Sequence, residues 1–309
     1  MPTREYSTLI YPNFGVSQFH DDGIFGRAVS IYIIDTGLTN TSEKLADVTV
    51  RSVTNPMGRK NTHGSFVTAI VASKAKSNPD MVPGIAPDAQ VYLADVSGEN
   101  GQIYTSSLVK AIRDAIDLQV DIISISLGTN TYDQDLEDVV AEASRRHILV
   151  FAAAGNCSCR AYEFPGACDS AISVGSIDLR RTLSPFNTRN DTVALFAPGQ
   201  NIGVPGSKSR LSGTSFAVPF VSGLAALELS RRRRFDPKAT MDRLDAIGTL
   251  RALLGLDAGI HTYCKSTGAV QGSFRPSEND GLIWLLFLSF FSGILVIYSI
   301  SLARRYLPW

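Results

Sequence analysis

Three residues that lie far apart in the sequence carry side chains suited to acyl transfer by a serine: Asp35, His63 and Ser215. This chemistry needs a base that takes the hydroxyl proton and a carboxylate that holds the base in the right tautomer. It also needs hydrogen-bond donors for the oxyanion, and backbone N–H groups can serve. The chain therefore offers a candidate for each requirement.

His63 is one of only four histidines in the chain, and its position is the most suggestive. It opens a predicted helix, and Gly64 directly behind it permits a close approach of another segment. His20 lies in an irregular stretch, and His261 lies in a polar one. His147 follows two arginines at a predicted helix end, where a cation is favourable.

Ser215 lies at a predicted loop-to-helix junction in the sequence SGTSFAVPFVSG. The first amides of a helix lack partners, so a serine there has a free backbone N–H and an exposed hydroxyl. A serine at such a junction is also a typical helix N-cap, and the local sequence leaves both interpretations open. Pro219 is unexpected inside this helix, because proline removes a hydrogen-bond donor and crowds the preceding turn.

Apolar runs with strand character alternate with segments of helical spacing. This alternation predicts an α/β fold with a parallel β-sheet covered by helices on both faces. Sites in such sheets form at the carboxyl ends of strands, where Asp35 and Ala154-Gly155-Asn156 fall. Strands are predicted over residues 28–35, 90–96, 121–127, 148–153, 171–177 and 193–196, and helices over 63–74, 106–118 with Ser106 as N-cap, 136–147 and 214–229.

Three motifs resemble the signature blocks of the subtilisin-like serine proteases, the subtilase or peptidase S8 family. They are Asp35-Thr36-Gly37, His63-Gly64-Ser65 and the segment GTSFAVP at residues 213–219. The chain order Asp, His, Ser is that of subtilisin. The resemblance covers roughly residues 25–232, and the proline in the serine helix is a trait of the family. Supporting segments are GIAPDAQVYLADV, VDIISISLG, LVFAAAGN, FPGACDSAISVGSID and ALFAPGQNI.

The resemblance implies a serine endopeptidase that cleaves polypeptides through an acyl-enzyme intermediate and needs no cofactor for catalysis. Ser215 would be the nucleophile, and His63 the general base and then the general acid. Asp35 would orient His63. Asn156 would donate to the oxyanion from its side chain, together with the Ser215 backbone N–H.

The same resemblance places the primary specificity pocket between two walls, Ser126-Leu127-Gly128 and Ala153-Ala154-Gly155. Glu163 precedes Phe164-Pro165 and falls at the base of this pocket, where relatives often have glycine. A buried carboxylate there would favour a Lys or Arg side chain at P1, because an unpaired buried charge is costly. The alternative is that Glu163 points to solvent. Cys157 would lie near this pocket, so thiol reagents are expected to impair activity.

The chain departs from the family pattern in several places. Only 34 residues precede Asp35, without the apolar core of a secretory signal. The chain is therefore a processed or truncated form, or it folds without a propeptide. Phe216 stands where methionine is common in the family. Many relatives bind structural calcium, to which Asn78 and Asp80 could contribute.

The composition excludes some classes of partner and leaves the cysteines open. Lys plus Arg and Asp plus Glu number 29 each, so no overall field points to nucleic acid. The basic run at residues 231–234 is interpreted as a solvated helix end. No histidine or acid at metal spacing completes a zinc site, so a local disulfide and free thiols both remain open for the four cysteines. These are Cys157, Cys159, Cys168 and Cys264.

Residues 282–303 form an uncharged stretch of 22 residues. At 1.5 Å per residue a helix of this length spans about 33 Å, enough to cross a membrane. A buried core helix is the alternative. The flanking basic residues Arg304, Arg305, Lys265 and Arg275 give only a slight bias to a protease outside the cytosol. The predicted organisation is an arm at 1–24, a peptidase domain at 25–260, a linker at 261–281, a single-pass membrane helix at 282–303 and a tail at 304–309.

Overall fold

The computed structural model describes residues 10–38, 50–54, 62–74, 83–98, 102–203, 210–256 and 282–283. In this part of the chain, seven strands form one sheet in the order β2-β3-β1-β5-β6-β7-β8, and all six pairings are parallel. The predicted parallel sheet is thus confirmed. The strands are β1 Ser30–Asp35, β2 Val50–Thr54, β3 Gln90–Asp95, β5 Ile122–Ile125, β6 Leu149–Ala153, β7 Ile172–Ile177 and β8 Val193–Pro198.

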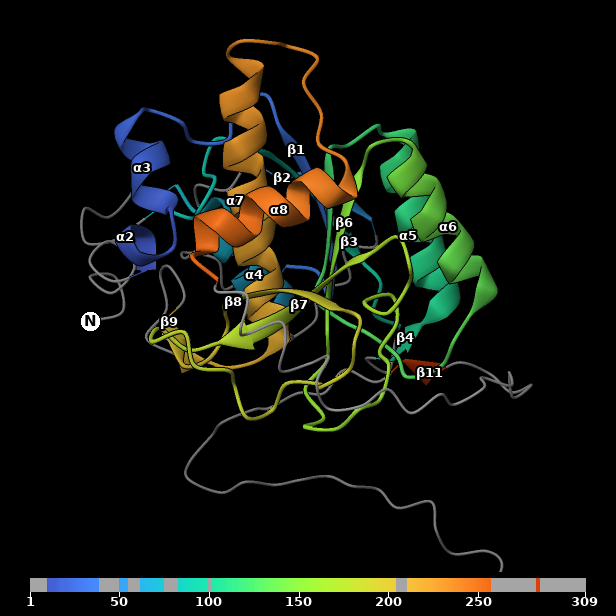
Figure 1. Cartoon of the computed structure of the whole chain (residues 1–309). Helices are drawn as coiled ribbons and strands as arrows, with labels where there is room; N and C mark the ends of the chain where they lie inside the picture. Colours follow the sequence, from blue (N-terminus) through green and yellow to red (C-terminus); the bar gives the residue numbers. More distant parts are fainter. Residues whose placement is uncertain are drawn as a thin grey trace, which may run out of the picture.

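Helices cover both faces of the sheet, as the alternating pattern predicts. Figure 1 shows α4 (His63–Ala72), α7 (Thr214–Arg233) and α8 (Arg243–Leu254) on one side, and α5 (Thr105–Asp117) and α6 (Gln134–Arg145) on the other. The central strand β1 is buried on both faces. Its Ile31 and Ile33 belong to the core under α4 and α7, whereas Tyr32 and Ile34 belong to the core under α5 and α6.

The helix ends differ from the prediction in their capping residues. Helix α5 starts at Thr105 after Tyr104, so Ser106 is inside the helix and is not the N-cap. Helix α6 starts earlier than predicted because the Asp133 side chain accepts a hydrogen bond from the Leu136 N–H. Helix α8, which was not predicted, is capped in the same way by Asp242 and ends at Gly255 in the left-handed conformation.

The N-terminal segment, predicted to be an irregular arm, is part of the folded body from residue 10 onward. It forms the short helices α2 (Tyr11–Asn13) and α3 (Val16–Asp21). The ring of Phe14 is buried edge-on against Phe220 of α7, at 6.0 Å between centroids. This burial explains the helices, which the polar and aromatic mixture of the segment did not signal.

The basic run at residues 231–234 lies at the end of α7, as predicted, but only Arg231 and Arg234 are exposed, so the interpretation as a solvated helix end holds only in part. Glu228 is only 1% exposed, and it accepts hydrogen bonds from Arg231 and Arg232 at 2.7 and 2.8 Å. The other contacts of the run, which we call the arginine clamp (Glu228 and residues 231–234), reach α8, Asp121 and the N-terminal segment. They are Arg232 with Asp245, Arg233 with Asp121 and the Ala28 carbonyl, and Arg234 with the carbonyls of Asp22 and Gly23.

Several predictions fall wholly or partly on residues that are not described. Of the predicted membrane helix, only Leu282–Ile283 is described, as strand β11 paired antiparallel with β4 (Ile103–Tyr104). Residues 284–303, the candidate calcium ligands Asn78 and Asp80, and Cys264 lie outside the described residues. Within the described part of the chain, none of the helices combines the length and the apolar character that a membrane crossing requires.

Candidate active site

The carboxylate of Asp35 and the imidazole of His63 are in direct contact. Asp35 is the last residue of β1 and is fully buried, and its Oδ1 accepts hydrogen bonds from the Thr36 backbone N–H at 2.7 Å and hydroxyl at 3.1 Å. His63 is the first residue of α4, and its Nδ1 lies 2.9 and 3.0 Å from the two carboxylate oxygens. Because a carboxylate only accepts, Nδ1 carries the proton and Nε2 is left as a basic nitrogen.

This contact depends on a close approach between the turn after β1 and the start of α4. A β-carbon on Gly64 would overlap the Gly37 carbonyl oxygen, so only glycine fits at position 64. The Gly64 N–H donates to the Thr36 hydroxyl at 3.3 Å and so ties the two segments together. The glycines in the two motifs are therefore explained by packing.

Asn156 follows β6 and is fixed against the start of α7. Its Oδ1 accepts hydrogen bonds from the Thr214 backbone N–H at 2.9 Å and from the Thr214 hydroxyl at 3.2 Å. The same hydroxyl accepts from the Gly155 N–H at 3.2 Å. With its oxygen engaged in this way, the side chain has its Nδ2 group left to donate. Thr214, which the sequence did not single out, is the residue that orients this amide.

Ser215 is the second residue of α7, and it is not the N-cap. That position belongs to Gly213, so the alternative of a capping serine is wrong. The Ser215 carbonyl accepts from the Ser126 hydroxyl at 2.8 Å. The adjacent Phe216 packs its ring against that of His63, at 5.2 Å between centroids. Ser215 is thus held between a neighbour that contacts His63 and a neighbour that contacts Asn156.

The two predicted pocket walls follow neighbouring strands, and Glu163 lies between them. Residues 126–128 follow β5, and Ala154-Gly155 follow β6. Backbone hydrogen bonds of 2.8 and 2.7 Å pair Thr129 with Phe164 and so bring Glu163 to this place. A β-carbon on Gly128 would lie 3.2 Å from Glu163 Oε2, and one on Gly155 would overlap Oε1. Glu163 is thus half-buried, with its carboxylate beside both wall segments.

Glu163 has no cationic partner among the described residues, since none of the ion pairs found there includes it. Burial raises the pKa of its carboxyl from the ordinary 4.5 to about 7. A hydrogen bond from the Asn156 backbone N–H opposes this shift without cancelling it. The group therefore titrates near neutrality, and an added cation beside it would favour the ionised form.

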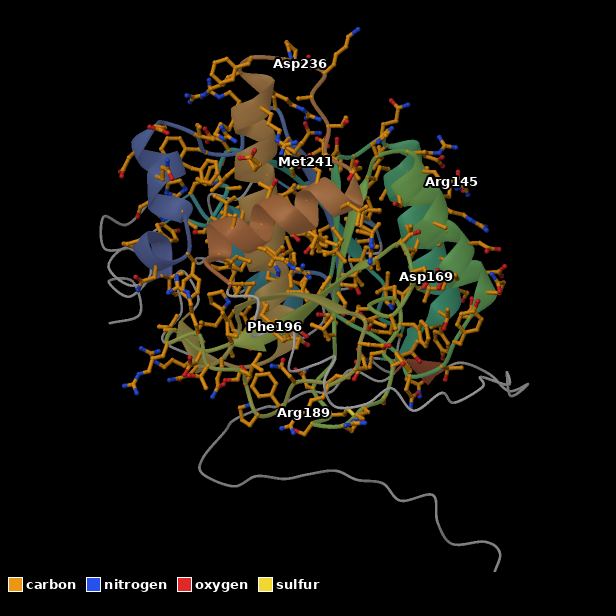
Figure 2. All side chains as sticks on the ribbon, viewed as in Figure 1. Arg145, Asp169, Arg189, Phe196, Asp236 and Met241 are labelled. Atoms are coloured by element: carbon orange, nitrogen blue, oxygen red, sulfur yellow. A yellow bond between two sulfur atoms is a disulfide. The ribbon has the colours of Figure 1, made fainter. Side chains whose placement is uncertain are left out.

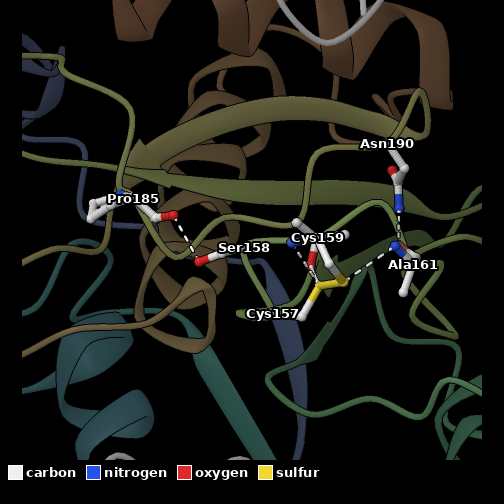
Figure 3. The surroundings of a disulfide bond; sticks show 7 residues. Cys157, Ser158, Cys159, Ala161, Pro185 and Asn190 are labelled. Carbon is white, nitrogen blue, oxygen red and sulfur yellow. Dashed lines mark hydrogen bonds between the residues drawn. A yellow bond between two sulfur atoms is a disulfide. The ribbon is translucent and has the colours of Figure 1, made fainter. Parts of the chain in front are cut away.

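The cysteine question is answered in part. Cys157 and Cys159 form a disulfide directly after Asn156, as Figure 3 shows. Cys157 thus has no free thiol, and the expectation that thiol reagents act there is wrong for this state. Cys168 is a free and buried thiol, and burial raises its pKa well above the ordinary value. Among the described residues no group of three or more His, Cys, Asp or Glu side chains could hold a metal ion.

Comparison with known sequences gives consistent matches. A family model described as the subtilase family matches residues 26–275. The chain is 33% identical over 223 residues to the major intracellular serine protease of Bacillus subtilis (strain 168), covering 66% of this chain and 69% of that protein. It is 32% identical over 255 residues to subtilisin E of the same organism, covering 76% of this chain and 66% of that protein.

Solved structures of similar fold are also proteases. The structure of the prenylagaramide maturation protease PagA superposes with a TM-score of 0.65 at 26% identity, covering 78% of this chain and 88% of that one. A cold adapted subtilisin-like serine proteinase gives a TM-score of 0.61 at 26% identity, covering 74% of this chain and 83% of that one. The residues matched by the family model, 26–275, include Asp35, His63 and Ser215.

Proposed function

Because the chain belongs to the subtilase family, we propose that it is a serine endopeptidase with Asp35, His63 and Ser215 as its catalytic triad. The observation that carries the proposal is the contact of His63 Nδ1 with the buried Asp35 carboxylate, at 2.9 and 3.0 Å. This contact orients His63 as a base, and Nε2 is the ring nitrogen that would take part in proton transfer.

The expected mechanism follows from the placement of these groups. His63 Nε2 takes the proton from the Ser215 hydroxyl as the oxygen attacks the scissile carbonyl carbon. The Asn156 Nδ2 group and the Ser215 backbone N–H donate to the oxyanion. The imidazolium, stabilised by Asp35, then gives its proton to the leaving amine, and an acyl-enzyme remains on Ser215. Water, activated by His63, hydrolyses this intermediate.

The primary specificity proposed for the enzyme is a Lys or Arg side chain at P1. Glu163 lies between the two wall segments and carries no described ion-pair partner, and its pKa is raised to about 7 by burial. A cationic side chain in this position would relieve the cost of the buried carboxylate. Truncating one partner of such a pair costs roughly 2 kcal/mol or more, about 30-fold in rate.

Labelling by a fluorophosphonate probe tests the triad directly. The full chain is expected to label, while Ser215→Ala and His63→Ala are not. Circular dichroism confirms that the variants are folded. Absence of labelling in a well-folded wild-type chain would contradict the proposal.

A P1 scan on matched peptide substrates tests the specificity separately. Arg and Lys are expected to exceed Leu and Phe, and Glu163→Gln is expected to lower the Arg to Leu ratio of kcat/KM about 30-fold. The exposed Glu142→Gln serves as the control and leaves the ratio unchanged. A wild-type enzyme with no preference for Arg over Leu would contradict this part.

A membrane anchor formed by the uncharged C-terminal stretch remains part of the proposal. Without the two residues of β11, residues 284–303 still give 20 residues and, as a helix, about 30 Å. The full chain is expected to stay with membranes after alkaline carbonate washing, and a chain ending at residue 281 is expected to be released. Release of both would contradict the anchor.

A further inference from the structure

A surface turn that holds the Cys157–Cys159 disulfide follows the proposed oxyanion residue without a break. Cys159 is exposed and Cys157 is half-buried, so reagents in solution can reach the sulfurs. Ser158 between them has φ 55°, a left-handed conformation that a side chain other than glycine adopts only when its surroundings impose it. Figure 3 shows this turn with its sulfurs and hydrogen bonds.

The turn rests on one neighbouring segment, residues 185–189. This segment also supports the strand end before Asn156, because the Thr188 N–H donates to the Gly155 carbonyl at 3.1 Å. Figure 2 places Arg189 at the opposite end of the molecule from Asp236. Four hydrogen bonds join the turn to this segment, each given from donor to acceptor. They are Ser158 N–H to the Phe186 carbonyl at 3.0 Å, Ser158 hydroxyl to the Pro185 carbonyl at 2.9 Å, Arg189 N–H to the Cys159 carbonyl at 2.7 Å, and the Thr188 hydroxyl to Cys157 Sγ at 3.4 Å.

On its other side the turn is joined to the proposed site through Asn156. The Asn156 backbone N–H bonds to the Glu163 carboxylate, and its side-chain oxygen is bound by Thr214. Because Asn156 and Cys157 share a peptide bond, a rotation at Cys157 would act against these contacts on the amide that would meet the oxyanion. In contrast, the Asp35–His63 contact is made by β1 and α4, which do not carry the turn.

We propose that the Cys157–Cys159 disulfide is a redox modification site whose reduction withdraws Asn156 from the oxyanion and slows acyl transfer at Ser215. This inference rests on the proposed function of the site. Once the cross-link is opened, Ser158 is free to leave its left-handed conformation, and its two hydrogen bonds to residues 185–186 are lost with it.

The modifying partner is a dithiol reductant. One of its thiolates attacks the exposed Cys159 sulfur and forms a mixed disulfide, and Cys157 leaves as a thiolate that takes up a proton. The second thiol of the reductant then attacks the mixed disulfide, forming its own disulfide and releasing the Cys159 thiol. Two electrons and two protons are transferred in total, and an oxidised dithiol reverses the step.

The full chain is to be equilibrated with mixtures of reduced and oxidised dithiol. Free thiols are located by alkylation and peptide mass, and kcat is measured on one peptide substrate. We expect kcat to fall about 10-fold as Cys157 and Cys159 become alkylatable, and to recover on reoxidation. Cys157→Ser and Cys159→Ser are expected to have the low kcat of the reduced wild type under all redox conditions. The buried Cys168→Ala serves as the control and keeps the full response.

Asn156→Ala separates an effect through the oxyanion from general loosening of the turn. In this variant, reduction is expected to change kcat less than twofold, because the donor that would move is absent. An equal response in wild type and Asn156→Ala would overturn the inference. So would an unchanged wild-type kcat after complete reduction, or free thiols at both positions before any reductant is added. A folded chain inactive in both redox states would instead overturn the proposed function.

Discussion

Two glutamates near opposite ends of helix α7 have pKa values that are shifted in opposite directions. Near its N-terminal end, beside Gly155 and Asn156, Glu163 is half-buried without a described cationic partner, and its pKa is raised to about 7. At its C-terminal end Glu228 is 1% exposed and hydrogen-bonded by Arg231 and Arg232, which hold its pKa below the ordinary value despite burial. A glutamate carboxylate is therefore paired with arginines at the C-terminal end of the helix and has no described cationic partner at the N-terminal end.

This difference separates the part of the molecule that holds the fold from the part that meets a substrate. A carboxylate enclosed by arginines stabilises one arrangement of segments, whereas a desolvated carboxylate without a partner is a feature of binding sites. Loss of a hydrogen-bond donor near Ser215, as in Asn156→Ala, should therefore change rates with little effect on stability, and substitutions in the arginine clamp should do the reverse.

The largest expected effect is on the rate at the Ser215 end. Asn156→Ala should lower kcat about 100- to 1000-fold, the loss found when subtilisin loses this type of donor. Its free energy of unfolding should change by no more than about 1 kcal/mol, since only the hydrogen bonds to Thr214 are lost. Steady-state kinetics and urea unfolding measure both quantities. A kcat within a few-fold of wild type would exclude Asn156 as an oxyanion donor.

The matching substitution at the clamp end is Glu228→Ala. It leaves Arg231 and Arg232 without their buried acceptor, so the free energy of unfolding should fall by about 3 kcal/mol. The value of kcat/KM per active site, counted with the fluorophosphonate probe, should stay within twofold. Glu142→Ala removes an exposed ion pair with Arg146 and should cost about 0.5 kcal/mol at most. Equal losses of unfolding free energy in Glu228→Ala and Glu142→Ala would contradict a special stabilising role of the arginine clamp.

The two glutamates should also give opposite dependences of stability on pH. Glu163 has a raised pKa, so the native state binds more protons than the unfolded state between pH 4.5 and 7. Wild-type stability should therefore fall by about 3 kcal/mol relative to Glu163→Gln across this interval and stay constant above it. Glu228 has a lowered pKa, so its contribution is present above pH 4.5 and is lost as the pH falls below it. Urea unfolding from pH 3.5 to 8 measures both differences.

A smaller effect is expected from Phe216, whose ring packs on the His63 imidazole. Phe216→Leu keeps an apolar side chain but removes the ring contact, so kcat should fall about threefold with KM unchanged, since a small displacement of the base is enough. The acidic limb of the pH profile of kcat/KM should shift as well, which a purely structural role would not produce. An unaltered pH profile would rule out a positioning role.

The sequence predicts the sheet and its main helices because both carry strong periodic signals. β1 and β5 are continuous apolar runs, and α5 and α6 place their apolar residues at helical spacing. The candidate site residues were found through motifs whose glycines have a packing reason, as Gly64 shows.

Other features depend on contacts between distant segments and could not be predicted locally. The helices α2 and α3 are explained by the burial of Phe14 against α7, which lies about 200 residues later in the chain. The arginine clamp resembles a solvated helix end in sequence, because Asp121, Asp245 and the N-terminal carbonyls meet it only in the fold. The hydrogen bond by which Thr214 orients Asn156 likewise could not be predicted from the sequence, because it forms only where β6 and α7 are adjacent.

The reach of the arginine clamp has a consequence for how the chain matures. Its contacts with the N-terminal segment join residues separated by 205 to 212 positions, as in Arg233 with Ala28 and Arg234 with Asp22. Long-range closures of this kind are formed late and slow the folding reaction. During synthesis the helix that carries Ser215 can be fixed only after residue 234 has left the ribosome. We therefore expect the newly synthesised protease to be inactive until nearly all of its catalytic domain has been made.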